Sequence, residues 1–148
     1  MTDQDTTDSV VITERVAASP EAVFDFLVDP DKLVRWLGSS VDIEPEPGGK
    51  FLVSIGNNVA TGSYVRVDPP KQVVFTWGWE DSADVPPGSS TVTISLTPDD
   101  DHTIVELRHA GLPRGGDDEH HKGWTFILPR LAAVVDGRDP GPELPHAD

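Results

Sequence analysis

Two short amphipathic helices predicted near the start of the chain, within residues 19–38, constrain its fold more than any other feature. Ser19-Pro20-Glu21 is typical of a helix start, because a capping hydroxyl, a proline in the first turn and a carboxylate all suit that end. Asp29-Pro30 ends the first helix, since a residue before proline avoids the α region. The second helix ends at Gly38, a residue that readily adopts the left-handed conformation of a helix terminus. Strands are predicted on both sides of this pair, so we expect the helices to pack against a sheet.

Alternating apolar and polar residues predict about six to seven strands. The clearest is Gln72–Glu80, where four large apolar side chains, two of them tryptophans, share one phase. Such a strand has one buried and one solvated face. The segments with this pattern are Val10–Ala17, Val41–Glu44, Lys50–Ile55, Val59–Val67, Gln72–Glu80, Ser89–Thr97 and Thr103–His109.

A long helix is predicted after the strands, over Glu119–Val135, because its apolar residues recur at core-facing spacings. Pro129 lies inside it and should remove one backbone hydrogen bond and bend the helix. We therefore expect a single domain over residues 9–136, preceded by a disordered N-terminus at 1–8. An irregular tail rich in proline and glycine, residues 137–148, should follow it.

The composition narrows the classes of function. The formal net charge of −15 should repel a nucleic-acid backbone or an anionic lipid surface, so neither is an expected partner. The absence of cysteine excludes disulfides, a thiolate nucleophile and cysteine-based metal sites. The polar, acidic N-terminus is unlike a signal peptide, and no apolar run approaches the length of a membrane span. We therefore expect a cytoplasmic location.

The order of predicted elements is a strand, two small helices, a run of strands and one long helix. Five short segments along the chain also have sequences that are typical of one known family. These segments are Ser-Pro-Glu-Ala-Val-Phe at 19–24, Asp-Pro with Leu-Val-Arg-Trp at 29–36, Pro-Gly-Gly-Lys-Phe at 47–51, Asp-Pro-Pro with Val-Val-Phe-Thr-Trp at 68–77, and Gly-Trp with Leu-Pro-Arg-Leu at 123–131. With them the chain resembles the START-like (SRPBCC) superfamily, in the branch named after activators of the ATPase of the ninety-kilodalton heat-shock chaperone. The resemblance implies an α+β helix-grip fold, in which a curved antiparallel sheet wraps around the long C-terminal helix and a pocket lies between them.

Two inward titratable residues are the candidates for catalysis. His109 continues the inward phase of the last strand and has an ordinary pKa near working pH, so it is a candidate acid/base or ligand-orienting group. The alternative is a core histidine with satisfied hydrogen bonds. Glu14 falls in the inward phase of the first strand, where burial would raise the pKa of its carboxyl group. A register shift of one residue would instead leave Glu14 solvated.

The predicted ligand-binding residues are the inward side chains of the strands and of the last helix. Tryptophans with their indole nitrogens are typical of small-molecule sites that combine an apolar wall with few polar contacts, although packing in a core is an equally open interpretation. The predicted set is Phe51, Val53, Tyr64, Phe75, Trp77, Trp79, Val92, Ile94, Leu107, His109, Trp124 and Leu128.

His120 and His121, beside the acidic residues 117–119, suggest a metal site only superficially. Adjacent residues on a helix point in different directions and do not converge on one ion, so we expect a solvated helix start and no metal. The sequence also lacks a phosphate-binding loop and a dinucleotide glycine motif, and we expect no cofactor.

Three functions remain open at this point. The first is a cytoplasmic START-like domain that binds a small hydrophobic or aromatic molecule between the sheet and the C-terminal helix. The second is an aromatase/cyclase-type enzyme that uses His109, with Glu14, on a polyketide-like substrate. The third is a co-chaperone-like domain of the stress response that binds a chaperone or another protein. The chain is expected to be a monomer or a homodimer. We favour the first of these.

Overall fold

The computed structural model describes residues 10–38, 40–55, 58–80, 85–111 and 116–138. The elements are β1 (Val10–Val16), α2 (Pro20–Val28), α3 (Pro30–Leu33), β2 (Ser40–Ile43), β3 (Lys50–Ile55), β4 (Asn58–Asp68), β5 (Gln72–Trp77), β6 (Ser90–Asp99), β7 (His102–Ala110) and α4 (Gly116–Val135). The predicted disordered residues 1–8 and positions 139–148 of the predicted tail lie outside the described residues.

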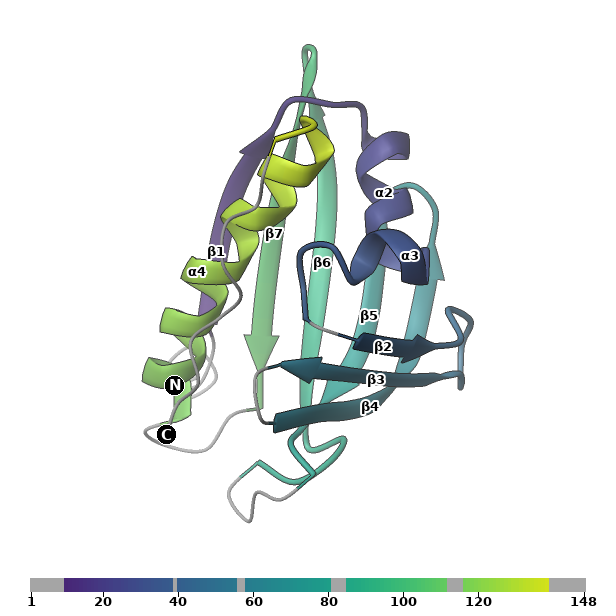
Figure 1. Ribbon diagram of the computed structural model, residues 1–148, viewed down its shortest axis with the longest axis vertical. Helices are drawn as coiled ribbons and strands as arrows, with labels where there is room; N and C mark the ends of the chain where they lie inside the picture. The colour runs from purple at the N-terminus through teal and green to yellow at the C-terminus, as the bar shows by residue number, and fades with distance from the viewer. Residues whose placement is uncertain (1–9, 39, 56–57, 81–84, 112–115, 139–148) are drawn as a thin grey trace, which may run out of the picture.

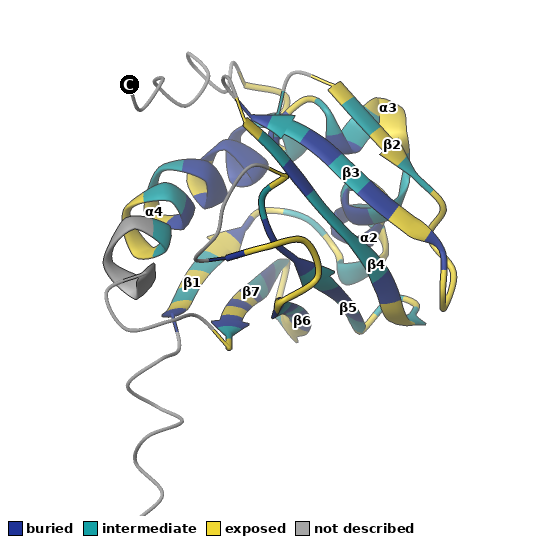
Figure 2. Ribbon diagram, turned by 90° about the horizontal axis from the view of Figure 1, so that it is seen from below, coloured by how far each residue is buried: buried dark blue, intermediate teal, exposed yellow. Residues whose placement is uncertain are grey.

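The seven strands form one antiparallel sheet in the order β1-β7-β6-β5-β4-β3-β2. Figure 1 shows α4 lying along β1 and β7, and α2 and α3 at the opposite side of the same face. Seen from below, the strands follow a curve, and all three helices lie on its concave side (Figure 2). The predicted helix-grip fold is therefore confirmed. None of the helices in the described part of the chain has the length and apolar character needed to span a bilayer.

The concave side holds the core, as the alternation of the strands predicts. In β5, β6 and β7 the apolar residues of one phase are buried and their neighbours are partly or fully exposed. On α4 the buried apolar residues are Trp124, Ile127, Leu128, Leu131, Ala132 and Ala133. Pro129 lies on the exposed side of α4, which continues through it to Val135. The residues that position the candidate site thus come from the strand phase and helix face that the sequence identifies.

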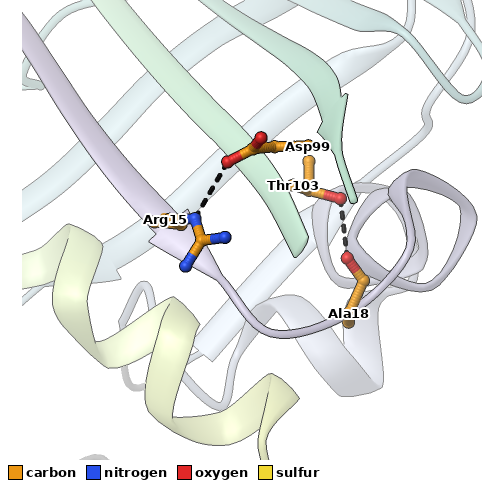
Figure 3. Close-up of polar contacts among 4 residues, drawn as sticks. All are labelled: Arg15, Ala18, Asp99 and Thr103. Atoms are coloured by element: carbon orange, nitrogen blue, oxygen red, sulfur yellow. Dashed lines mark hydrogen bonds and ion pairs between the residues drawn. The ribbon is translucent and has the colours of Figure 1, made fainter. Parts of the chain in front are cut away.

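The turn from β1 into α2 is held by a buried hydroxyl. The Thr103 Oγ1 atom at the start of β7 donates to the backbone oxygen of Ala18 at 2.7 Å (Figure 3). Nearby, Arg15 of β1 pairs with Asp99 of β6 at 2.9 Å, but both side chains are about half exposed. Of these two contacts the buried hydrogen bond matters more for stability, since exposed ion pairs contribute little.

The second predicted helix is shorter than expected. α3 ends at Leu33, and the chain continues in turns where the Trp36 N–H bonds to the Leu33 oxygen, three residues back, at 3.2 Å. Gly38 does not adopt the positive φ predicted for it. It is required for another reason, because a side chain there would collide with the carbonyl group of Ser54 and a methyl group of Val53 in β3. Glycine here allows a close approach between backbones.

The predicted strand Gln72–Glu80 is also shorter than expected and ends at Trp77. Gly78 follows, and a side chain at this position would collide with the backbone of Pro86 in the β5–β6 connection. Beyond it, Trp79 makes an isolated bridge with Ala60 of β4. The tryptophan keeps its predicted place on the inward side, although it lies outside the regular strand.

Candidate functional site

A buried chain of hydrogen bonds surrounds His109 at the end of β7. The Trp124 Nε1 atom of α4 donates to His109 Nδ1 at 3.0 Å. On the other side of the ring, His109 Nε2 lies 2.8 Å from Ser90 Oγ, and the Ser90 hydroxyl donates to the Trp77 oxygen at 2.7 Å. Since the serine proton goes to Trp77, the serine oxygen accepts from His109. The imidazole is therefore neutral and carries its proton on Nε2.

This arrangement does not suit His109 to act as a general base. Burial lowers the pKa of its imidazole to about 3, and the charge of His120 lowers it further, so the ring is neutral at working pH. In a nucleophile–base pair the histidine accepts the hydroxyl proton. Here the direction is reversed, because Nε2 donates to Ser90 while Nδ1 accepts from Trp124. His109 has the satisfied hydrogen bonds of a core histidine, which is the second of the two interpretations of its sequence position.

A second indole–imidazole hydrogen bond lies closer to the surface. Trp79 Nε1 donates to His120 Nε2 of α4 at 3.1 Å, and both residues are partly buried. The His120 and His109 rings meet edge to face with centroids 4.9 Å apart. The Trp79–His120 and Trp124–His109 hydrogen bonds together connect the first half of α4 to the sheet.

Four aromatic rings from β3, β4 and β5 form the neighbouring part of the concave face. Phe51 and Phe75 stack with centroids 4.1 Å apart, and Tyr64 meets both edge to face. Trp77 lies beside the two phenylalanines, and its ring centroid is 5.1 Å from that of Trp124 in α4. We call Phe51, Tyr64, Phe75 and Trp77 the aromatic wall. Every one of its side chains is at most 3% exposed.

Two polar atoms of the aromatic wall have no partner. Among the described residues, Tyr64 Oη and Trp77 Nε1 are the buried side-chain atoms that make no hydrogen bond. Burial also raises the pKa of the Tyr64 hydroxyl well above its usual value, so the tyrosine remains protonated. Buried polar groups are nearly always paired in native proteins, and these two therefore mark the wall as a candidate site.

Comparison with known proteins places the chain in a family. The model of the family described as "Activator of Hsp90 ATPase homolog 1-like protein" matches residues 17–136. The chain belongs to this family. The match includes all five segments on which the resemblance in the sequence rests. A comparison with curated proteins gives no match.

Solved structures of several similar proteins share the fold. An AHSA1-like protein from Rhizobium etli is 40% identical, with 95% of this chain and 94% of that chain covered and a TM-score of 0.69. CalU16 from Micromonospora echinospora is 28% identical, with 90% and 77% covered and a TM-score of 0.75. An HSP90 activator from Plasmodium falciparum is 26% identical, with 92% and 99% covered and a TM-score of 0.72.

Within this family fold, the predicted ligand-binding residues gather on the concave side. Eleven of the twelve are buried, and the other, Trp79, is partly buried. Burial alone fits both a packed core and a ligand contact, so their role as a binding set stays a prediction. The unpaired atoms identify Tyr64 and Trp77 as the two members with hydrogen-bonding capacity to spare.

Glu14 takes the inward phase, and the alternative of a shifted register is wrong. It pairs with Val105 of β7, a fully buried residue, in an unbroken antiparallel register. Its side chain is only partly buried, and burial raises the pKa of the carboxyl group. Glu14 lies on β1, next to α4, while His109 pairs with Val10 at the other end of the strand. The structure therefore does not bring the two catalytic candidates together.

Ser90 and the hydrogen bond to His120 are not among the predicted features of the site. Ser90 lies two residues before Val92 in the inward phase of β6, so alternation alone would have identified it as an inward polar residue. The Trp79–His120 contact joins residues from the sheet and from α4, and no local pattern indicates it. Among the described residues, no group of three histidine, aspartate or glutamate side chains is arranged to hold a metal ion.

Proposed function

We propose that this protein binds a small apolar or aromatic molecule at the aromatic wall, between the sheet and α4. The observation that carries the proposal is the pair of unpaired polar atoms, Tyr64 Oη and Trp77 Nε1. Leaving a buried polar group without a hydrogen bond costs about 1–3 kcal/mol. A bound molecule would supply the missing partners and recover part of that free energy.

The surroundings of these atoms support a small-molecule ligand. Binding sites for such molecules are mostly apolar and aromatic, with a few polar groups that fix orientation. The aromatic wall has this composition, since two phenylalanine rings separate and contact Tyr64 and Trp77. Flat ligands gain additional stabilisation from stacked or edge-to-face contacts with such rings.

An enzymatic role for His109 has less support. Its two ring nitrogens are both engaged within the protein, and the Ser90 hydroxyl is committed to the Trp77 oxygen. A reaction at this pair would first have to break hydrogen bonds that are fully buried. We therefore assign the pair a structural role beside the proposed site.

A protein-partner role has one specific argument in its favour. The Plasmodium protein is named an HSP90 activator, and its fold covers 92% of this chain. Gel filtration of the protein mixed with a purified chaperone of that class would test this alternative. Co-elution that survives saturation with a small-molecule ligand would support it as an additional role.

Ligand binding is tested first by native mass spectrometry of the purified protein, followed by extraction and identification of any bound molecule. Thermal unfolding with a panel of neutral naphthalene derivatives provides the second test. A probe at a hundred times its Kd should stabilise the fold by about 2.7 kcal/mol, which corresponds to roughly 5–10 °C in Tm for a chain of this size.

The matched control is Val65→Ala, because Val65 follows Tyr64 in β4 but is 53% exposed. This variant should bind the probes as the unmodified protein does. If no probe changes Tm and no small molecule is recovered from the purified protein, the proposed function is wrong.

A further inference from the structure

We infer that the ligand carries a neutral hydrogen-bond acceptor, such as a carbonyl oxygen, which receives a hydrogen bond from Trp77 or Tyr64, and that carboxylates are rejected. This inference rests on the proposed function and specifies the chemistry of the molecule that the site takes.

The four tryptophans of the chain differ in one respect that identifies the ligand-facing one. Trp36 Nε1 donates to the Phe26 oxygen at 2.8 Å, and Trp79 and Trp124 donate to His120 and His109. Trp77 Nε1 is buried but donates to nothing. The protein therefore satisfies every indole N–H except the one that lies in the aromatic wall.

An indole nitrogen only donates, so its missing partner must be an acceptor. The acceptors nearest in the hydrogen-bond chain are already used. Ser90 Oγ accepts from His109 and donates to the Trp77 oxygen, and His109 Nδ1 accepts from Trp124. We therefore assign the acceptor for Trp77 to a bound molecule, and a protonated ligand amine, which only donates, would not satisfy it.

Tyr64 offers a second donor on the same wall. Its ring contacts are the edges and faces of Phe51 and Phe75, which contain no acceptor atom, and its hydroxyl is unpaired. Because burial keeps the hydroxyl protonated, Tyr64 can donate throughout the working pH range. Two unpaired donors on an apolar surface select oxygen acceptors such as ketones, quinones and esters.

The charges of the core exclude an anionic acceptor. The one charged side chain that is buried among the described residues is Arg130 of α4, whose Nε donates to the Trp36 oxygen at 3.1 Å. His109 is neutral, since its one ring proton is on Nε2 while Nδ1 accepts from Trp124. None of the four side chains of the aromatic wall carries a charge, so a carboxylate there would lose its hydration without an ion-pair partner in the wall, and the net charge of −15 would add repulsion.

Three probes with one aromatic frame test the inference: acetylnaphthalene, ethylnaphthalene and naphthoate, substituted at the same ring position. They present a neutral acceptor, no acceptor and an anionic acceptor, respectively. Calorimetric titration of the full-length protein should give a Kd for the ketone about tenfold lower than for the hydrocarbon, because one or two buried hydrogen bonds are gained. Naphthoate should show no measurable binding at neutral pH.

The indole N–H signals in a proton–nitrogen NMR spectrum provide the direct readout. The ketone should move the Trp77 signal downfield, while the signals of the other three tryptophans act as internal references. Tyr64→Phe removes one oxygen atom and should weaken ketone binding severalfold without changing hydrocarbon binding. Val65→Ala should leave both unchanged.

The outcomes separate this inference from the proposed function. Equal affinity for ketone and hydrocarbon, or tighter binding of naphthoate, would overturn the inference and leave the proposed function standing. An unchanged Trp77 signal on ketone binding, together with undiminished ketone binding by Tyr64→Phe, would also overturn it, because neither donor would then bond to the ketone. Failure of all three probes, together with failure of the wider panel, would overturn both.

Discussion

Acidification should destabilise this protein in a way that depends on His109. The pKa of its imidazole is about 3 in the folded state, against 6.5 for an ordinary histidine, because burial and then the charge of His120 disfavour the protonated form. Between these values the unfolded chain binds one proton that the folded chain does not. The free energy of unfolding should therefore fall as the pH falls, by about 1.4 kcal/mol per pH unit in the middle of this range. From pH 6.5 to about pH 4.5 the loss is about 2 kcal/mol.

The assay is urea unfolding followed by tryptophan fluorescence at several pH values in this range. Because the chain has 26 acidic residues that also respond to pH, the quantity to compare is the difference between the unmodified protein and His109→Asn. The variant should lose about 2–4 kcal/mol at neutral pH and show a shallower pH dependence. His121→Asn, at an exposed helix position, controls for the loss of a histidine.

The reasoning about His109 is refuted if the two pH profiles run parallel. Should the variant fail to fold, nitrogen NMR of the unmodified protein gives the same information. The His109 ring should carry its proton on Nε2 and remain neutral at about pH 5. A ring that titrates near its ordinary value would contradict the buried hydrogen-bond chain.

Three further predictions concern stability and can be measured by chemical denaturation. Tyr64→Phe should stabilise the ligand-free protein by about 1 kcal/mol, because it removes a buried hydroxyl without a partner; a loss of stability would show that the hydroxyl is paired. Gly62→Ala should destabilise the fold by at least about 2 kcal/mol, since a side chain there would collide with the backbone of Thr76 in β5. Gly123→Ala is the control, because a side chain there meets open space on α4 and should stabilise the fold by up to about 1 kcal/mol. Thr103→Val should cost about 1–3 kcal/mol and Arg15→Ala less than about 1 kcal/mol, and a reversed order would contradict the burial argument.

The parts of the fold that can be predicted from the sequence are those that depend on local patterns of apolar and polar residues. A strand with one buried face requires alternation, so the inward phase of β5 can be identified without a structure. The same alternation places Glu14 on the concave side, where its register with Val105 confirms it. The order of elements and the family segments then suffice to identify the helix-grip fold.

The hydrogen bonds of the site cannot be predicted in this way, because their partners come from distant elements. His109, Ser90 and Trp124 belong to β7, β6 and α4, and the direction of each bond depends on where the serine proton goes. Alternation shows that Trp77 is buried but does not show that it is the indole without an acceptor. The predicted role of Gly38 is also incorrect. Its position after a helix suggests a positive φ, whereas the structure requires glycine there because a side chain would collide with β3.

The inward polar groups of this protein form two sets with different consequences. In the first set, centred on His109, every donor has an acceptor, and the result is a connection between the sheet and α4. In the second, Tyr64 and Trp77 have donors without acceptors, which is the basis of the proposed ligand site. A buried group whose hydrogen bonds are satisfied within the protein contributes mainly to stability. A buried group without a partner contributes to selectivity when a ligand binds. Substitution of His109 should therefore reduce stability and leave the preference for ketone over hydrocarbon intact, while Tyr64→Phe should weaken that preference without reducing stability. Under the proposed function His109 supports the site through its hydrogen bonds, and the selective contacts come from Tyr64 and Trp77, which do not titrate at working pH.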